Sequence, residues 1–233
     1  MKRVLKVLAA ILLITPVLLA GFVWYTLQPK EQNLTLPTSL VSADSAQGVA
    51  LLESSNYKAD FMALDQSFVA QRYISFCGVA SSVTVLNALG RDSNQSAFFT
   101  DATRDVRSQF EVTFGGMTLE QLDGLLSAHG LKTQAVHGDE LSLEEFRAIV
   151  ERNLSTDDDY LLVNYQRKDL DQIGSGHISP IAAYNASSDQ VLVLDTASHK
   201  YPYTWIPLEL LYNALHDIDS ASEKPRGIIE VAL

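Results

Sequence analysis

The sequence predicts an α+β domain whose first half is mostly helical and whose second half is an antiparallel sheet. Apolar residues recur at helical spacing from Gly48 to Val150. After Asp159 the pattern changes to short runs rich in β-branched and aromatic residues. Helices followed by strands are typical of an α+β fold, and we expect a cleft where the two halves meet.

The expected elements have recognisable ends. The stretch 48–64 contains two short helices, because a polar break at 54–56 interrupts its apolar pattern. A helix begins at Cys77 and has Gly90 as its C-cap. Further helices begin after Thr118 and Ser142, which are N-cap residue types. The expected strands are 160–165, 178–184, 191–194 and 227–231, with one helix at 207–215.

The chain is expected to have three parts: a signal peptide or signal anchor at 1–27, a linker at 28–42 and a catalytic domain at 43–233. Lys2, Arg3 and Lys6 precede an uncharged apolar run from Val7 to Leu27. A positive flank stays in the cytoplasm, so we expect export to the bacterial periplasm, with the N-terminal helix as an anchor to the inner membrane. Contact with the membrane is expected only through this segment.

The charge of the exported part excludes nucleic acid as a partner. Without the segment before Gln28 the chain keeps 14 basic and 28 acidic residues, a formal charge of −14. Such a surface repels phosphate backbones. A single cysteine cannot form an internal disulfide, and the histidines share no spacing with cysteines or carboxylates that is typical of a metal site.

Cys77 is the candidate nucleophile, because it is the residue at which a helix begins. The first N–H groups of a helix are unpaired and carry the positive end of the backbone dipole, which favours a thiolate. Gln71, six residues earlier, could direct its amide toward the sulfur and stabilise an oxyanion. The N–H groups of the first helical turn would be the second donor.

His177 and Asp195 are the candidate base and its orienting carboxylate. A hairpin centred on Ala186 places these two residues opposite each other, with their Cβ atoms roughly 5 Å apart on one face. Asp195 would then accept a hydrogen bond from one ring nitrogen, and the other would face the cleft. Gly176, directly before the histidine, permits close backbone approach.

Each residue taken alone also has a structural interpretation. A lone cysteine is more often a small buried apolar residue, and a histidine at a strand start is more often part of a structural hydrogen bond. Asp195 and Gln71 could belong to a turn and a solvated loop. His199 competes as the base but lies outside the hairpin register. The joint spacing is what favours catalysis.

Three blocks of this sequence resemble phytochelatin synthase, and the resemblance runs from about residue 40 to 231. The blocks are FCGVASS at 76–82 with VLNAL at 85–89, GSGHISPI at 174–181 with YN at 184–185, and LD at 194–195 with KYP at 200–202 and WIPL at 205–208. The resemblance implies a papain-like fold and a Cys-His-Asp triad with an oxyanion glutamine. The matching positions are Cys77, His177, Asp195 and Gln71.

The resemblance also implies a reaction and a substrate. Cys77 would attack the peptide carbonyl that joins cysteine to glycine in glutathione, release glycine and hold a γ-glutamylcysteinyl thioester. A second glutathione would accept the acyl group to make a phytochelatin, or water would accept it. Arg167 and Arg226 match basic positions of the family's cleft, and planar guanidinium groups suit the α-carboxylate of a γ-glutamyl donor.

Two departures from the family bear on the second half of the reaction. Ser198 stands where the family usually has arginine, three residues after the aspartate, and the chain ends at Leu233 without the cysteine-rich extension of eukaryotic members. We therefore expect hydrolysis of glutathione to dominate over transfer. No tightly bound cofactor is expected; cadmium or zinc would enter as a glutathione thiolate complex. The alternatives are a peptidase of ordinary peptides and a non-catalytic domain that binds glutathione or its metal complex.

Overall fold

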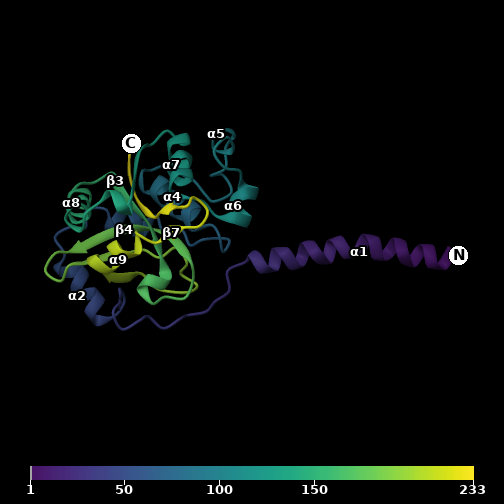
Figure 1. Ribbon diagram of the computed structural model, residues 1–233, viewed down its shortest axis with the longest axis horizontal. Coiled ribbons are helices and arrows are strands. Elements are labelled where there is room, and N and C mark those ends of the chain that lie inside the picture. The colour runs from purple at the N-terminus through teal and green to yellow at the C-terminus, as the bar shows by residue number, and fades with distance from the viewer. Residues whose placement is uncertain (1) are drawn as a thin grey trace.

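The computed structural model describes residues 2–233, with the side chains of residues 2–11 and 13 left out of the description. Mixed helix and antiparallel sheet confirm the predicted α+β class (Figure 1). The helices are α1 Lys2–Leu27, α2 Ala46–Ser54, α3 Phe61–Gln66, α4 Cys77–Ala88, α5 Asp101–Arg104, α6 Gln109–Gly115, α7 Leu119–Ala128, α8 Leu143–Asn153 and α9 Leu208–Ala214, with 3-10 turns η1 Gly138–Glu140 and η2 Arg167–Leu170. The strands are β1 Val41–Ser42, β2 Lys132–His137, β3 Asp159–Gln166, β4 Gly176–Asn185, β5 Gln190–Val193, β6 Thr204–Pro207, β7 Ile218–Asp219, β8 Lys224–Pro225 and β9 Gly227–Ala232.

In the described chain, seven strands form one antiparallel sheet in the order β1-β6-β5-β4-β3-β9-β2, and β7 pairs separately with β8. The sheet is covered on both faces. Leu162 of β3 packs in a core with α4 and α7, whereas its neighbours Leu161 and Val163 pack in a second core with α8 and α9. Successive side chains of a strand point to opposite faces, so β3 is buried throughout.

The helix ends follow the local sequence signals. Thr118 and Ser142 cap α7 and α8 through capping boxes with Gln121 and Glu145, as expected from their residue types. Gly90, directly after the C-cap of α4, has a φ of 73°. This left-handed conformation is accessible to glycine at little cost, which makes it a good helix terminator.

The predicted division into a helical and a stranded half is incomplete. The first half also contributes strands β1 and β2. Strand β6, directly before α9, was not predicted either. Strand β2 pairs along its whole length with the last strand, β9. It is an edge strand of mostly polar residues, so its hydrophobic pattern is weak and its partner lies nearly a hundred residues away.

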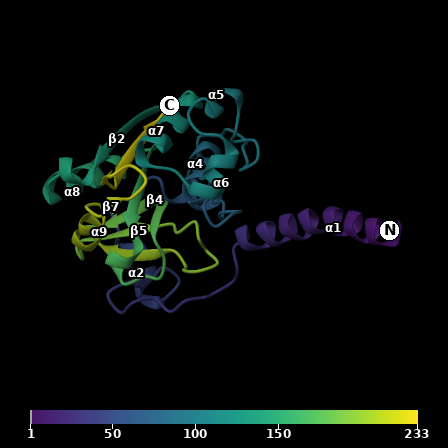
Figure 2. The same cartoon turned by 45° about the vertical axis from the view of Figure 1, so that its right-hand side comes forward.

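Helix α1 projects from the rest of the molecule (Figures 1 and 2). No helix in the part of the chain that the structure describes is long and apolar enough for a membrane crossing. The side chains of residues 1–11 and 13, about half of the segment predicted as a signal or anchor, lie outside the described residues.

The segment expected as a linker runs along the domain surface. The backbone N–H groups of Gln32 and Leu34 donate to the carbonyls of His199 and Lys200 at 2.8 and 2.9 Å. Leu40 is buried, and the segment ends in the edge strand β1. These contacts bring residues 32–34 beside the loop that follows Asp195.

Candidate active site

Helix α4 begins at Cys77 as predicted, and its first turn packs tightly against β4. A Cβ added at Gly78 would lie 2.5 Å from Met117 Sδ and 3.2 Å from Ile178 Cδ1, so only glycine fits there without displacing them. The Ser81 hydroxyl lies 2.8 Å from the Cys77 carbonyl and 3.1 Å from that of Ile178. These contacts fix the start of α4 against the strand that carries His177.

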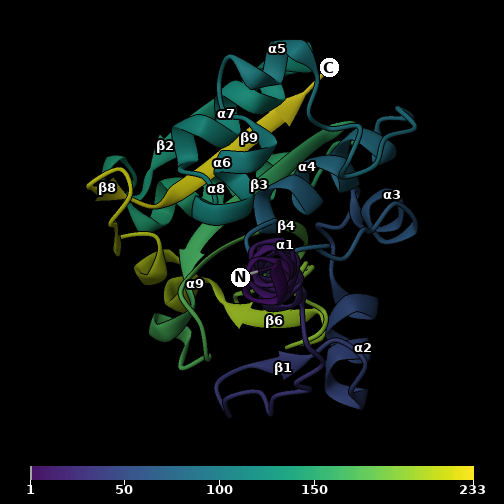
Figure 3. The ribbon, with the colours of Figure 1, turned by 90° about the vertical axis from the view of Figure 1, so that its right-hand side faces the viewer.

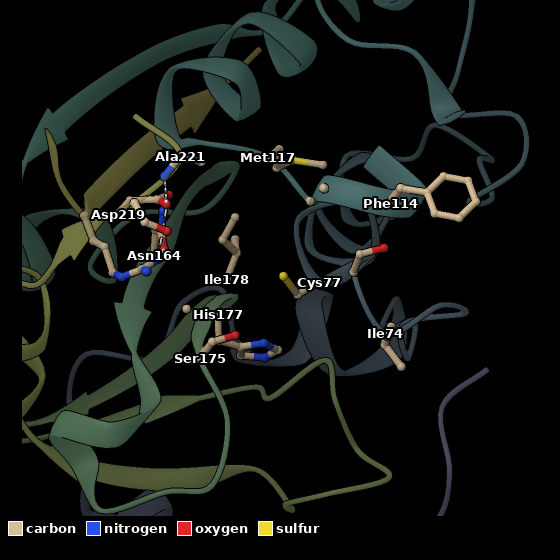
Figure 4. Close-up of a pocket in the computed structure, with 16 residues that line it drawn as sticks. Ile74, Cys77, Phe114, Met117, Asn164, Ser175, His177, Ile178, Asp219 and Ala221 are labelled. Atoms are coloured by element: carbon tan, nitrogen blue, oxygen red, sulfur yellow. Dashed lines mark hydrogen bonds and ion pairs between the residues drawn. The ribbon is translucent and has the colours of Figure 1, made fainter. Parts of the chain in front are cut away.

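A pocket of about 370 Å³ opens beside the sulfur (Figure 4). In this view the Cys77 sulfur points into the space that His177, Ile178 and Met117 surround. The pocket is lined by Ile74, Ser75, Cys77, Phe114, Gly115, Gly116, Met117, Asn164, Ser175, Gly176, His177, Ile178, Asp219, Ser220, Ala221 and Arg226.

His177 and Asp195 lie in contact, as predicted. The imidazole Nε2 is 2.8 Å from Asp195 Oδ1, and both side chains are buried. This is an ion-pair distance, but the ring N–H is not aligned with the oxygen for a hydrogen bond. The same Oδ1 accepts from Arg167 Nη2 at 2.7 Å and from the Ala197 N–H at 2.9 Å. Because Nε2 faces the carboxylate, Nδ1 is the nitrogen left for the cleft.

The predicted hairpin register was wrong, although the predicted contact exists. The turn spans 186–189, and Tyr184 pairs with Val191, three residues further along than a turn centred on Ala186 requires. A register shift between Ile181 and Ala183 then offsets the strands again. Asp195 reaches His177 because it lies in the loop beyond β5 and not opposite it in the ladder.

The charges of the triad depend on burial. Burial raises the pKa of the Asp195 carboxyl, but His177 and Arg167 outweigh it and hold that pKa below its usual range. For His177, burial and then the positive charge of Arg167 lower the pKa to about 4, against the opposing effect of Asp195. The imidazole is therefore neutral at pH 7.

Burial also raises the pKa of the Cys77 thiol above its ordinary value. The backbone N–H groups of Ile178 and Gly78 and the charge of Arg167 favour the thiolate, but they do not offset the desolvation. The predicted effect of the helix start is therefore present but smaller than that of burial. The raised pKa of Cys77 and the lowered pKa of His177 both favour a neutral thiol beside a neutral imidazole.

Gln71 lies near the sulfur, but its amide is engaged elsewhere. It is buried in a small cavity of about 80 Å³ that Cys77, His177 and Arg167 also line. Its Nε2 donates to the carbonyls of Tyr73 and Ile74, both at 3.0 Å, and its Oε1 has no partner. An oxyanion role for Gln71 therefore requires its amide to turn from these carbonyls toward the substrate.

Arg226 is placed in the larger pocket, as its predicted substrate role requires. Its Nη1 donates to Asn164 Oδ1 at 3.0 Å and lies 3.8 Å from Asp219 Oδ2. A Cβ added at Gly176 would lie 2.1 Å from that same Nη1. Any side chain at this position would therefore collide with the guanidinium. Sequence reasoning missed Asn164 and Asp219. A buried asparagine inside the apolar strand 160–165 was a signal that could have found the first.

Arg167 was predicted beside Arg226 as a substrate residue, and the structure places it elsewhere. It is 2% exposed, and its two terminal nitrogens donate to Gln172 Oε1 and Asp195 Oδ1, each at 2.7 Å. It lines the small cavity but not the larger pocket. This guanidinium therefore holds the carboxylate of Asp195, and each of its terminal nitrogens already donates one hydrogen bond within the protein.

The competing base His199 also lines the small cavity, but it forms no hydrogen bond or ion pair with Asp195 among the described residues. The carboxylate of Asp195 forms an ion pair with Arg167 and lies 2.8 Å from Nε2 of His177. The geometry therefore favours His177 as the base. Within residues 2–233, no cluster of three or more His, Cys, Asp or Glu side chains is arranged to hold a metal ion.

Comparison with known proteins gives one consistent result. A family model described as phytochelatin synthase matches residues 31–228. The chain is 34% identical over 178 residues to a glutathione gamma-glutamylcysteinyltransferase of Lotus japonicus and to one of Triticum aestivum, covering 74% of this chain and 37% and 36% of those proteins. It is 29% identical over 207 residues to the enzyme of that name from Schizosaccharomyces pombe, covering 83% of this chain and 49% of that protein. The chain thus spans between about a third and a half of the length of these relatives.

Proposed function

We propose, from the premise that this chain belongs to the phytochelatin synthase family, that it is a thiol acyltransferase and hydrolase acting on glutathione. The observation that carries the proposal is the pocket itself: Cys77 and His177 line the same pocket as Arg226 and Asp219. The proposal includes a papain-like arrangement, in which the cleft lies between the nucleophile helix α4 and the sheet strand β4.

The part of the pocket around Arg226 and Asp219 suits the γ-glutamyl group. That group carries an α-carboxylate and an α-ammonium on one carbon. Arg226 offers a guanidinium to the carboxylate, and Asp219 offers a carboxylate to the ammonium. A substrate held there extends its cysteine-glycine peptide bond toward Cys77. An ordinary peptide lacks the paired charges at that position.

Acylation begins from the neutral pair. As Cys77 Sγ attacks the peptide carbonyl, its proton passes to His177 Nδ1, and Asp195 stabilises the imidazolium that forms. The oxyanion is met by the N–H at the start of α4 and by the reoriented Gln71 amide. The C–N bond then breaks, glycine leaves with the proton from His177, and a γ-glutamylcysteinyl thioester remains on Cys77.

The thioester is resolved by water or by the α-amine of a second glutathione. Transfer requires the second molecule to be held close enough to compete with water. Ser198 is exposed and provides no charge for that purpose. We therefore place hydrolysis to γ-glutamylcysteine first and phytochelatin synthesis second. Cadmium or zinc would act as part of the substrate, as a thiolate complex of glutathione, in heavy-metal detoxification or glutathione turnover.

The proposed location is the bacterial periplasm, with the N-terminal segment as a signal or an inner-membrane anchor. The support is the order of basic residues, apolar run and acidic domain along the sequence. Appearance of the domain in the cytoplasmic fraction of its native cells would contradict this part.

The central test is incubation of the full chain with glutathione, with and without cadmium or zinc, followed by mass spectrometry. We expect free glycine, γ-glutamylcysteine and smaller amounts of longer γ-glutamylcysteine oligomers. A thioester adduct should map to Cys77, and Cys77→Ala should abolish glycine release while leaving glutathione binding intact. Equal turnover of an α-linked tripeptide would favour an ordinary peptidase. Binding without glycine release in the parent protein would favour the non-catalytic domain.

A further inference from the structure

The side of the domain from which α1 projects carries a group of exposed apolar side chains. Phe110 and Phe114 lie one turn apart on α6, with ring centroids 4.8 Å apart, and are 73% and 56% exposed. Ile74 is 54% exposed, and its N–H donates to the carbonyl of Leu27, the last residue of α1, at 3.1 Å. Figure 3, viewed along α1, shows α6 beside the helix axis on that side.

The exposed apolar surface continues onto α1 itself. Trp24 and Tyr25 in the last turns of the helix are 60% and 58% exposed. A groove of about 440 Å³ lies between α1 and the domain, lined by Trp24 and Leu27 on one side and by Tyr73 and Thr113 on the other. We call Trp24, Tyr25, Ile74, Phe110 and Phe114 the collar.

Two basic side chains lie close to aromatic rings in and beside the collar. Lys30 Nζ lies 4.3 Å from the ring centroid of Tyr25, and Arg72 lies 5.5 Å from that of Tyr73. Tryptophan and tyrosine next to lysine and arginine, at the end of an exposed apolar helix, form the composition found at the interface between lipid tails and headgroups. The acidic Glu111 of α6 is tied back to Ser108 in a capping box.

We propose that the collar rests on a lipid bilayer, with Phe110 and Phe114 among the acyl chains just below the headgroups. The proposal requires α1 to enter the lipid beside these two rings, and it holds whether or not α1 crosses the whole bilayer. Ile74 and Phe114 also line the pocket of about 370 Å³ beside Cys77. The mouth of that pocket then opens at the level of the headgroups. The inference is independent of the reaction that Cys77 performs.

Quenching of tryptophan fluorescence by lipids with brominated acyl chains tests the proposal on the full chain. The chain has two tryptophans, and Trp205 is fully buried with its Nε1 bonded to the Gly48 carbonyl, so it provides a constant background. In a Trp24→Phe background, Phe110→Trp places a reporter in the collar. Met62→Trp, at a position 58% exposed on α3, is the matched control.

In vesicles of phosphatidylcholine and phosphatidylglycerol with brominated acyl chains, the Phe110→Trp reporter should lose emission and shift to shorter wavelength. The Met62→Trp reporter should do neither. A vesicle-bound protein whose Phe110 reporter is unquenched, or both reporters quenched alike, would overturn the proposal. So would a concentration-dependent blue shift of the Phe110 reporter without lipid, because it would assign the collar to a second copy of the chain. Unchanged far-ultraviolet circular dichroism of each variant verifies its fold.

Discussion

Arg167 and Arg226 are two buried arginines at the same end of the sheet, yet they are held in different ways. Arg167 follows β3 and donates from both terminal nitrogens at 2.7 Å. Arg226 precedes β9, and its nearest carboxylate oxygens lie at 3.6 and 3.8 Å. Its Nε has no hydrogen-bond partner. The difference distinguishes a guanidinium bonded closely to Asp195 from one whose short side-chain hydrogen bond is to Asn164.

Removing Arg167 should have the larger effect on the fold. Arg167→Met leaves the buried Asp195 without its hydrogen-bonded guanidinium, and breaking a buried ion pair typically costs about 3–5 kcal/mol. We expect a loss of that order in the free energy of unfolding, measured by urea denaturation, together with a loss of kcat. A variant as stable as the parent would show that Asp195 does not depend on this guanidinium.

Removing Arg226 should instead affect substrate binding. Asp217, one of its two acidic neighbours, keeps bonds to Gln166 and Lys168, whereas Asp219 loses its ion pair with this arginine. Loss of a charge-assisted hydrogen bond of about 1.5–3 kcal/mol corresponds to a roughly 10- to 100-fold rise in KM for glutathione. Steady-state glycine release measures this, with Arg226→Lys as the variant that retains charge but not the planar fork. An unchanged KM would place the γ-glutamyl group elsewhere.

The pH dependence of catalysis tests whether Cys77 and His177 form a neutral pair or a preformed ion pair beside the Asp195 that Arg167 holds. Because His177 has a pKa of about 4, kcat/KM should be flat through pH 5–7 and fall as the pH drops through that value and the base is protonated. The folded pKa lies below the unfolded one, so this histidine also favours folding above the unfolded pKa and loses that contribution as the pH falls toward 4. Circular dichroism at each pH separates the two losses.

The thiolate itself provides the complementary measurement. Its ultraviolet absorbance should be absent in the free protein at pH 7 and appear only at alkaline pH, because burial raises the pKa of Cys77. The Cys77→Ala variant supplies the baseline. Full thiolate absorbance at neutral pH in the unliganded protein would favour the preformed ion pair.

Introducing a positive charge at Ser198, in the loop after Asp195, should have the smallest effect. Ser198→Arg places a guanidinium on the exposed loop three residues after Asp195, where the resemblance to the family led us to expect one. We expect the ratio of oligomers to γ-glutamylcysteine to rise about two- to tenfold, since one partly screened contact with a second glutathione contributes about 0.5–1.4 kcal/mol. Mass spectrometry of products measures the ratio, and Ser198→Gln controls for side-chain bulk.

Local signals predicted more of the molecule than nonlocal ones. The start of α4 at Cys77 and the caps at Thr118 and Ser142 depend on residues within one helical turn of each other, and all three were confirmed. The pairing of β2 with β9 and the shifted register of β4 with β5 depend on which distant strands fit together. Hydrophobic periodicity contains no information about that choice when a strand is polar or a bulge intervenes.

The sequence by itself determined the reactive atoms and the order in which the chain supplies them: a thiol at a helix start, an imidazole at a strand start and a carboxylate beyond the next strand. Only the tertiary structure decided the direction in which their pKa values shift, and which arginine contacts Asp195 and which lines the pocket. The physical reason is burial. Desolvation raises the pKa of Cys77 and lowers that of His177, and it depends on how closely α4, β4 and the loop after Asp195 pack together.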